Sequence, residues 1–524
     1  MQALPLEIID RIVHFLAGGQ VDALRKRTPE EDGGWSRLAP YAVLSPQFLE
    51  AIERRVWRSL DISNDQLEEW AYHLSQGRRR PGYLKELRFR VDLPAVKMAE
   101  MVNYERPEET AATSEEFGLH VRRLFDMLHR LERHQGRGIH LHLADVAHEA
   151  PDMTGYGDRC CYDREPMTRH EFARMWHYDR ARITLPGVDS LPLLGCVRRL
   201  SFGEWCRTPE PRVQLEVAAR MPGLTAVDLV LDASERVSPP LLREDHRSLA
   251  EALRVYSEPT RKVAHATLKM LPRGASVVLQ SGRLDLTAPQ GYDLLGASLR
   301  VWSQRLTSFR VRGVVDGSLF WPRPQEEAAG AEPEWPRLQD LDVRAERHAP
   351  SGRSYFARSE PAYSAPQPPD YSFESTGDDS NHDEEGRRFS RSVPREETLQ
   401  PLFAAWARAL ARMPSLRTAR LRFRIKFFHE GGGGTRQRWH IMEDWGVVYE
   451  APGHDDGGKN NNNTAWYGML TSEEKRCRRL VFLNTGGWRP GQETMDLLQA
   501  VGADSWPGSE MAVLTVDRDK IVRK

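Results

Sequence analysis

Apolar residues near the start of the chain recur three and four positions apart, as on one face of a helix. Pro5 suits the first turn of that helix, where a missing N–H costs nothing, and Gly18-Gly19 ends it. The stripe consists of Ile8, Ile9, Ile12, Val13 and Leu16. After a polar loop and a short apolar element at 38–44, Ser45-Pro46 fits an N-cap followed by proline at the first helical position. Residues 4–62 are therefore expected to form a small bundle of three helices.

Further along the chain, segments with the period-2 alternation of half-buried strands return, each after a helix or a loop. They lie at 83–91, 196–202, 221–229, 306–311, 335–343 and 413–423. Leu194 and Leu224 are separated by 30 residues, and Leu306 and Leu338 by 32. Periods in this range are typical of leucine-rich repeats, in which stacked units bury the apolar face that one unit cannot. The alternative is an ordinary α/β domain with proline-punctuated turns.

Other segments predict helices, a disordered insert and a terminal sheet. An apolar stripe over 117–131 predicts a helix, with Thr113 and Glu116 as a capping box at its start. A second stripe runs over 402–413. Residues 346–398 are rich in Ser, Pro, Asp, Glu and Arg without periodicity, which is typical of disorder. Strands of a small terminal sheet are expected around 439–449 and 479–483.

Taken together, these patterns predict an α+β or α/β protein. A small helical domain of three helices precedes an irregular solenoid of short strands and helices that resembles leucine-rich repeats. The expected divisions are the helical domain at 1–62, the repeat-like region at 63–345, the disordered insert at 346–398 and a C-terminal repeat with a strand-rich domain at 399–524.

Composition narrows the classes of function. The chain has 524 residues, 28% of them charged, and no apolar run of the ~18 residues that a membrane-spanning helix needs, so no membrane is expected. The chain has five cysteines and shows no leader pattern at its N-terminus. We therefore expect its thiols to be reduced and the protein to lie in the cytoplasm, the nucleus or both. The 74 basic and 75 acidic residues give a net charge of −1, so the chain has no overall positive field to attract nucleic acid, which we do not expect as a partner.

Motifs that carry chemistry are mostly missing from the sequence. It contains no phosphate-binding Gly-x-x-x-x-Gly-Lys-Ser/Thr run, no Gly-x-Ser-x-Gly elbow and no Cys-x-x-Cys pair. His140 and His142 alternate on an expected strand and so share one face, but a metal would need two further ligands. We therefore expect no catalytic residue, no metal site and no cofactor.

Three motifs in the first 60 residues carry a family resemblance. Leu4-Pro5-Leu6-Glu7-Ile8 opens the segment, the stretch from Leu38 through Leu44-Ser45 to Phe48 follows, and Val56-Trp57-Arg58-Ser59-Leu60 closes it. This order resembles the F-box. The Leu-Ala-Pro-Tyr-Ala run at 38–42 is similar to that of a filamentous-fungal subgroup, whose members often continue with a strand like the one at 83–89. The part from about Met413 resembles an uncharacterised C-terminal domain of the same proteins.

The resemblance implies a subunit of a cullin-RING (SCF-type) ubiquitin ligase with no catalytic residues of its own. An F-box binds the Skp adaptor, which links it to the cullin scaffold, while the downstream region binds an unknown protein substrate. The residues that would contact the adaptor, or build the small core beneath it, are Leu4, Pro5, Glu7, Ile8, Ile9, Ile12, Leu38, Leu44, Phe48, Val56 and Trp57. The alternatives are that these helices only cap the repeats, that the repeats form a scaffold or nucleic-acid surface, or that scattered His, Asp and Glu residues form a non-local enzyme site.

Overall fold

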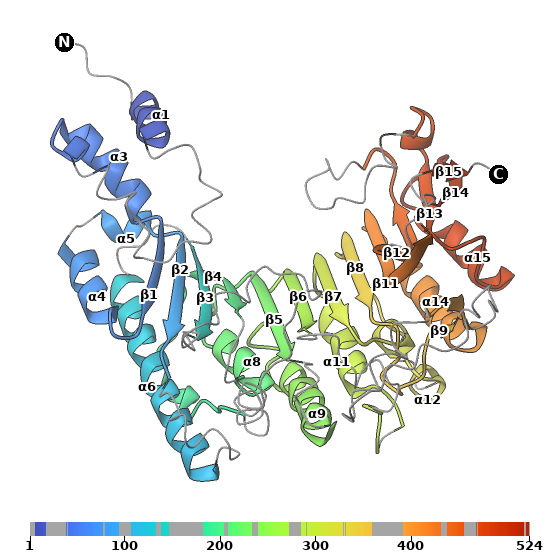
Figure 1. Ribbon diagram of the computed structural model, residues 1–524, viewed down its shortest axis with the longest axis horizontal. Helices are drawn as coiled ribbons and strands as arrows, with labels where there is room; N and C mark the ends of the chain where they lie inside the picture. The colour runs from blue at the N-terminus through green and yellow to red at the C-terminus, as the bar shows by residue number, and fades with distance from the viewer. Residues whose placement is uncertain are drawn as a thin grey trace, which may run out of the picture. The chain divides into compact units, whose positions relative to one another are not determined.

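The computed structural model describes most of the chain (Figure 1). The described residues are 6–16, 38, 40–76, 79–93, 106–132, 138–145, 182–203, 208–232, 239–271, 285–289, 291–328, 330, 332–358, 391–430, 438–454, 468, 470–517 and 520–522. They fall into two compact units. Unit 1 comprises residues 1–228 and 258–263, and unit 2 comprises residues 229–257 and 264–524.

Unit 1 contains short parallel strands connected by helices and loops. Its helices are α1 (Leu6–Leu16), α3 (Pro46–Val56), α4 (Leu67–Gln76), α5 (Arg80–Tyr83), α6 (Pro107–Glu132), η4 (Val188–Ser190) and α8 (Pro211–Ala219). Its strands are β1 (Ser59–Ser63), β2 (Glu86–Val91), β3 (Ile139–Asp145), β4 (Val197–Phe202) and the first residues of β5 (Ala226–Asp232).

The strands of unit 1 lie side by side in chain order, and every pair is parallel. Alternation decides which side chains enter the core: in β2, Leu87, Phe89 and Val91 are fully buried, whereas the residues between them reach the other face. Figure 1 shows α6 and α8 on one side of these strands. The apolar stripe of α6, which includes Phe117, is also buried.

Unit 2 contains the rest of β5 and the elements that follow. Its helices are α9 (Pro239–Val255), α11 (Leu294–Ser303), η5 (Gly317–Leu319), α12 (Pro324–Ala328), α14 (Glu396–Leu410), η7 (Glu474–Arg476) and α15 (Gln492–Ala500). Its strands are β6 (His265–Leu271), β7 (Ser308–Gly313), β8 (Asp340–Ala345), β9 (Phe356–Arg358), β10 (Arg391–Pro394), β11 (Thr418–Glu430), β12 (Arg438–Glu450), β13 (Arg478–Leu483), β14 (Met511–Asp517) and β15 (Lys520–Val522).

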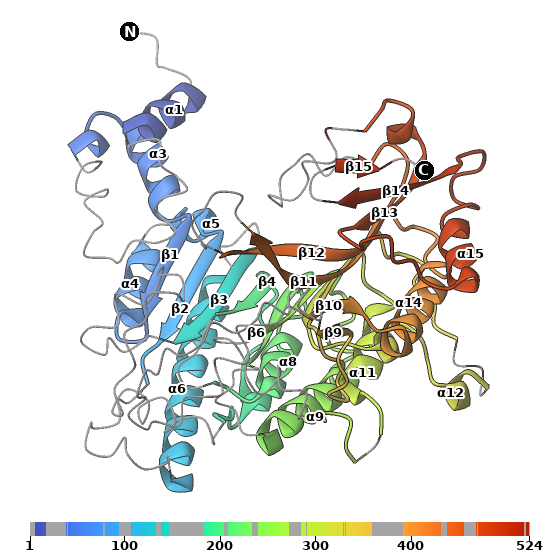
Figure 2. The ribbon, with the colours of Figure 1, turned by 45° about the vertical axis from the view of Figure 1, so that its right-hand side comes forward.

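The sheet of unit 2 has the order β5-β6-β7-β8-β11-β12-β13-β14-β15, and β9 pairs with β10 apart from it. Strands β6, β7, β8 and β11 are parallel neighbours, whereas β12 is antiparallel to both β11 and β13. Figures 1 and 2 show α9, α11 and α14 on one side of these strands. The face opposite these helices is lined by every second residue of each strand.

An aromatic cluster fills the core of unit 2. The Trp445 ring lies 5.0 Å from Phe356, 5.7 Å from Phe423 and 5.2 Å from Trp488, measured between ring centroids, and the Phe356 ring meets it edge-on. Phe403 of α14 joins the same cluster. Edge-to-face contacts of this kind add to the burial of large rings, so they fix the packing of α14 on the sheet.

The structure confirms the mixed α/β class and most of the predicted elements. Strands β2, β4, β5, β7, β8 and β11 overlap the six alternating segments, and four of them extend beyond the predicted ends. Strands β12 and β13 coincide with the predicted terminal strands but continue the sheet of unit 2 rather than form a separate one. The helix predicted over 117–131 is longer in the structure, where α6 begins ten residues earlier, at Pro107. Thr113 is therefore no N-cap: its hydroxyl donates to the Glu109 carbonyl at 2.9 Å, inside the helix.

The predicted disordered insert at 346–398 was too wide at both ends. Residues 346–358 are described, and β9 pairs antiparallel with β10. Tyr355 and Phe356 are fully buried because each ring packs 5.2 Å from the ring of Phe423. These two aromatic side chains thus bury apolar surface and order residues 346–358, although the segment as a whole is poor in apolar residues. Residues 359–390 lie outside the described part of the chain.

Within the described ranges, no helix combines the length and the apolar character needed to cross a bilayer.

Candidate functional site

The predicted adaptor-binding residues come from α1, the segment around 38–44 and α3, which pack on one another. Their shared core consists of Ile9, Val13, Leu38, Ala51 and Ile52, with Tyr41, Ala42, Phe48 and Val56 partly buried around it. These residues lie on the inner stripe of each helix, as their spacing predicts. The structure therefore brings Ile9, Leu38, Phe48 and Val56 together in one small core, which we call the N-terminal core.

The start of α3 is fixed by its local sequence. The Ser45 hydroxyl accepts a hydrogen bond from the Phe48 N–H at 3.2 Å, and Pro46 occupies the first helical position. This is the N-cap that the sequence predicts. Along the helix that starts there, Ala51 and Ile52 belong to the N-terminal core, whereas Leu49 does not.

Apolar side chains remain exposed beside the N-terminal core. Val43 is 86% exposed, Leu44 61%, Leu49 44% and Ile8 40%. They come from the same three segments that build the core. Of these four, Ile8 and Leu44 were predicted from the sequence as adaptor contacts. Val43 and Leu49 were not, although both flank the N-cap sequence at Ser45.

Other predicted site residues are placed differently. Glu7 is exposed on the first turn of α1, and Ile12 is half-buried. Leu4 and Pro5 lie outside the described residues. Trp57 is buried, with 8% exposure, but it is not part of the N-terminal core. Its ring packs instead against α4 and α5.

Polar contacts connect α1, α3 and α5. Arg54 of α3 pairs with Asp10 of α1 at 3.3 Å and with Glu50 at 3.2 Å. Arg80 of α5 donates to Glu53 of α3 at 2.8 Å, and its guanidinium carbon lies 5.0 Å from the centroid of the Trp57 ring. Exposed pairs such as Arg54–Asp10 contribute about 1 kcal/mol at most, so the apolar core and the half-buried Arg80 contacts provide most of the attachment.

His140 and His142, the other ligand candidates, share one face of β3 as predicted. His140 Nε2 lies 2.7 Å from the Ser201 hydroxyl, which donates to Asp228 at 2.8 Å. Burial, followed by the positive charge of Arg88, lowers the pKa of His142 to about 4, so its ring is neutral at neutral pH. Among the described residues, no group of three or more His, Cys, Asp or Glu side chains could hold a metal ion.

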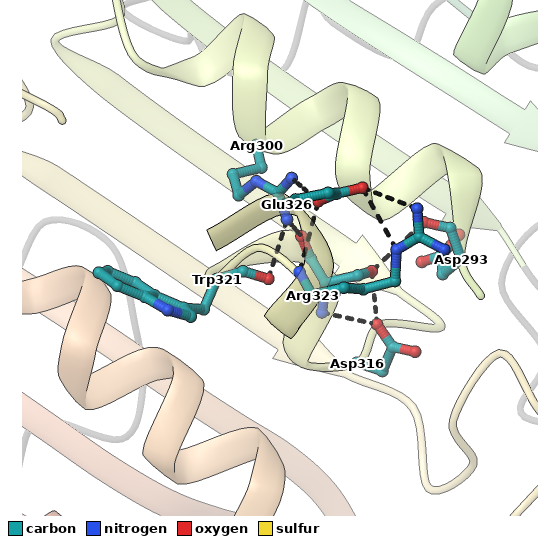
Figure 3. A network of polar contacts seen from close by, with 7 residues as sticks. Asp293, Arg300, Asp316, Trp321, Arg323 and Glu326 are labelled. Atoms are coloured by element: carbon teal, nitrogen blue, oxygen red, sulfur yellow. Dashed lines mark hydrogen bonds and ion pairs between the residues drawn. The ribbon is translucent and has the colours of Figure 1, made fainter. Parts of the chain in front are cut away.

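A second polar network joins α11, η5 and α12 in unit 2 (Figure 3). Arg300 donates to the carbonyls of Ser318 and Trp321 at 2.9 and 2.8 Å and pairs with Glu326 at 2.8 Å. Arg323 pairs with the other oxygen of Glu326 at 2.9 Å. Burial alone would raise the pKa of Glu326, but the hydrogen bonds from the two arginines outweigh it and lower that pKa.

Two carboxyl groups at the edge of this network share a buried environment. Burial, followed by the negative charge of Asp316, raises the pKa of Asp293 to about 8. The Asp316 carboxylate accepts from the N–H and the hydroxyl of Ser318 at 2.9 and 2.6 Å, which caps η5. Raised carboxyl pKa values often mark acid–base catalysts. Asp293 is only 4% exposed, however, so a substrate has no access to it, and the pair serves the packing of α11 on η5.

No model of a known protein family matches the chain, and a search of curated proteins finds no match either.

Proposed function

We propose that this protein is the substrate-recognition subunit of an SCF-type ubiquitin ligase, which binds the Skp adaptor through an F-box at residues 1–62 and a target protein through the downstream region. The observation that carries the proposal is the N-terminal core with four large apolar side chains left exposed beside it. Several exposed apolar side chains on one small helical segment are typical of a site that another protein covers.

The size of the segment supports the same proposal. A chain of about 60 residues buries too small a fraction of its apolar surface to be stable with much to spare. Exposing Val43 and Leu44 to water therefore has a cost that folding of the segment does not recover. Burial of both side chains in an apolar groove of the adaptor would recover it. A helical pair that served only to cap the repeats would need no such exposed residues.

The proposed mechanism contains no bond-making residue in this chain. The F-box would attach the protein to the ligase, and the downstream sheet units would hold the target. Tethering raises the effective concentration of a target lysine near the charged ubiquitin carrier, which accelerates transfer without any new catalytic group. A repeat-like α/β region suits this role because it offers a broad surface on rigid strands.

Co-purification of the full chain with purified Skp adaptor tests the proposal. Leu44→Asp combined with Leu49→Asp places two charges in the exposed apolar surface, so we expect adaptor capture to be lost while the thermal midpoint is unchanged. The matched control is Val255→Asp combined with Val301→Asp, since these residues of α9 and α11 are 67% and 60% exposed. The control should capture the adaptor normally. No capture by the unmodified chain, or equal capture by both double variants, would rule the proposal out.

A further inference from the structure

Six arginines occupy neighbouring positions on the face of the unit 2 sheet opposite α9, α11 and α14. They belong to β7, β8 and β11, which are adjacent in the sheet. The register places Arg312 beside Arg344 and Arg344 beside Arg422. The arginine surface, as we call it, consists of Arg310, Arg312, Arg344, Arg420, Arg422 and Arg424.

Part of this charge is neutralised within the sheet. Arg422 pairs with Asp342 and with Asp444, each at 2.8 Å, and Arg344 pairs with the same Asp444 at 3.1 Å. Two arginines and two aspartates thus form one connected network. The other carboxylates of β8 and its C-terminal end are Asp340 and Glu346. Glu450 of β12 also attracts Arg420 but pairs with Arg479, so among the described residues seven arginines face five carboxylates and the surface keeps an excess of positive charge.

The excess is concentrated around Arg312. Burial, followed by the positive charge of Arg344, lowers the pKa of Arg312, and Arg424 lowers it further against the opposing effect of Glu346. Among the described residues, the buried Nε atoms of Arg312, Arg344 and Arg422 have no hydrogen-bond acceptor. Crowded like charges and unpaired buried donors both destabilise a folded protein. Such costs are retained where a surface has a function.

Access to the arginine surface is open at its two ends. The side chains of Arg310 and Arg424 are exposed, and Arg312 is half-buried between them and the paired network. On this face of β7, β8 and β11, the residues whose side chains are described, up to Arg424 in β11, include no aromatic ring on which the bases of a single-stranded nucleic acid could stack. The interspersed aspartates would also repel a continuous phosphate backbone. This is the mixed charge that a nucleic-acid-binding surface is not expected to show.

Carboxylates are the ligands that fit best, because guanidinium forks bind them with two parallel hydrogen bonds. Asp444, held between Arg344 and Arg422, already demonstrates the contact inside the protein. We propose that the arginine surface binds an acidic segment of a partner protein, whose Asp or Glu side chains pair with Arg310, Arg312 and Arg424. The inference rests on the proposed function insofar as it names the chemical class of target that the downstream region would hold.

Fluorescence anisotropy with the full chain and a labelled oligoglutamate peptide tests this binding, with no adaptor present. Arg310→Gln combined with Arg424→Gln should weaken binding about tenfold or more, since each lost guanidinium removes a charge-assisted hydrogen bond. The matched control is Arg408→Gln combined with Arg412→Gln. Arg408 lies in the last turn of α14 and Arg412 just after the helix, and they pair with Glu327 and Glu332. The control therefore changes the net charge equally but away from the arginine surface. It should bind as the unmodified chain does.

Three results would overturn the inference. The first is an unlabelled oligoglutamine that competes as well as oligoglutamate does. The second is a double variant at Arg310 and Arg424 that binds normally, or no more weakly than the control variant. The third is an RNA oligonucleotide that displaces the peptide at lower concentration than oligoglutamate. Because the adaptor is absent from this assay, a failure here leaves the adaptor-capture result intact, and a failure of adaptor capture leaves peptide binding intact.

Discussion

The indole ring of Trp57 meets that of Trp70 edge-on, with ring centroids 5.4 Å apart and planes inclined by 79°. Trp57 directly follows α3, whereas Trp70 lies in α4, so the contact attaches the helix that carries the N-terminal core to the rest of unit 1. Arg80 lies over the same Trp57 ring and binds Glu53. Trp57 is therefore a structural residue of this junction.

Trp57→Ala should lower the free energy of unfolding by about 3–5 kcal/mol, because it removes a buried ring together with its aromatic and cation–π contacts. Urea denaturation followed by circular dichroism measures the change. Trp506→Ala is the control, since Trp506 is 36% exposed and should cost less. A Trp57 variant as stable as the Trp506 variant would contradict the packing described for this junction.

Leu4→Ala combined with Pro5→Ala should abolish co-purification with the Skp adaptor while the rest of the chain stays folded. The resemblance to the F-box assigns both residues to the apolar groove of the adaptor, and the exposed Ile8 follows them on α1. Thermal unfolding separates loss of binding from loss of fold. Leu193→Ala, at another exposed apolar position, serves as the control. Retained capture by the Leu4 and Pro5 variant would refute this assignment.

The strands of both units were predictable from sequence wherever apolar alternation was long and regular, as at Leu87-Arg88-Phe89-Arg90-Val91. Strands β1 and β6 were not identified, because Ser59–Ser63 is short and His265–Leu271 mixes small and polar residues among the apolar ones. The N-cap at Ser45 was found because its signal is local. The spacing in α3 also predicted that Phe48, Ile52 and Val56 share one face, whereas the exposure of Leu49 followed only from the packing.

The arginine surface could not be predicted in the same way. Asp342 and Arg422 are 80 residues apart in the chain, and their contact depends on β8 and β11 being neighbours. No local pattern encodes that adjacency, since β9 and β10 lie between them in sequence. Asp293 and Asp316 likewise come from different elements, so their shared environment follows only from the packing of α11 against η5.

Asp293→Asn should flatten the pH dependence of stability between about pH 6.5 and 8. The carboxyl has a pKa of about 8 in the folded protein and about 3.9 when unfolded, so the folded state holds a proton that the unfolded chain releases. Stability contributed by this group is therefore present at low pH and is lost as the pH rises toward 8. The amide cannot ionise, and it should gain on the order of 2 kcal/mol relative to the unmodified chain across this interval.

The titration of the buried histidines lies below this pH interval. Burial lowers the pKa values of His142 and His246 to about 4, so their contribution to stability changes only below the unfolded pKa of about 6.5. Chemical denaturation at a series of pH values gives the slopes. Asp340→Asn, a change at a half-buried carboxyl of β8, should keep the slope of the unmodified chain. Burial also raises the pKa of Asp316, so parallel slopes for the Asp293 variant and the unmodified chain would show that the proton of the pair is not held by Asp293.

The buried pair of Arg479 and Glu450 should show strong coupling in a double-mutant cycle. Arg479 is fully buried, its Nη2 lies 2.9 Å from a Glu450 oxygen, and its Nη1 donates to the Lys475 carbonyl at 2.8 Å. Glu450→Ala leaves the guanidinium charge without its buried counter-ion, which should cost about 3–5 kcal/mol. Arg479→Ala likewise leaves the Glu450 carboxylate without its buried counter-ion.

Because the double variant buries neither charge, it should be less destabilised than the sum of the two single variants by about 1–3 kcal/mol. Urea denaturation of the four proteins measures this difference. The exposed pair Arg261–Glu258, with side chains 67% and 76% exposed, provides the reference cycle, in which water screens both charges and the coupling should stay below about 1 kcal/mol. Equal coupling energies in the two cycles would mean that water reaches the Arg479 side chain. That result would contradict the complete burial of this side chain beside Glu450.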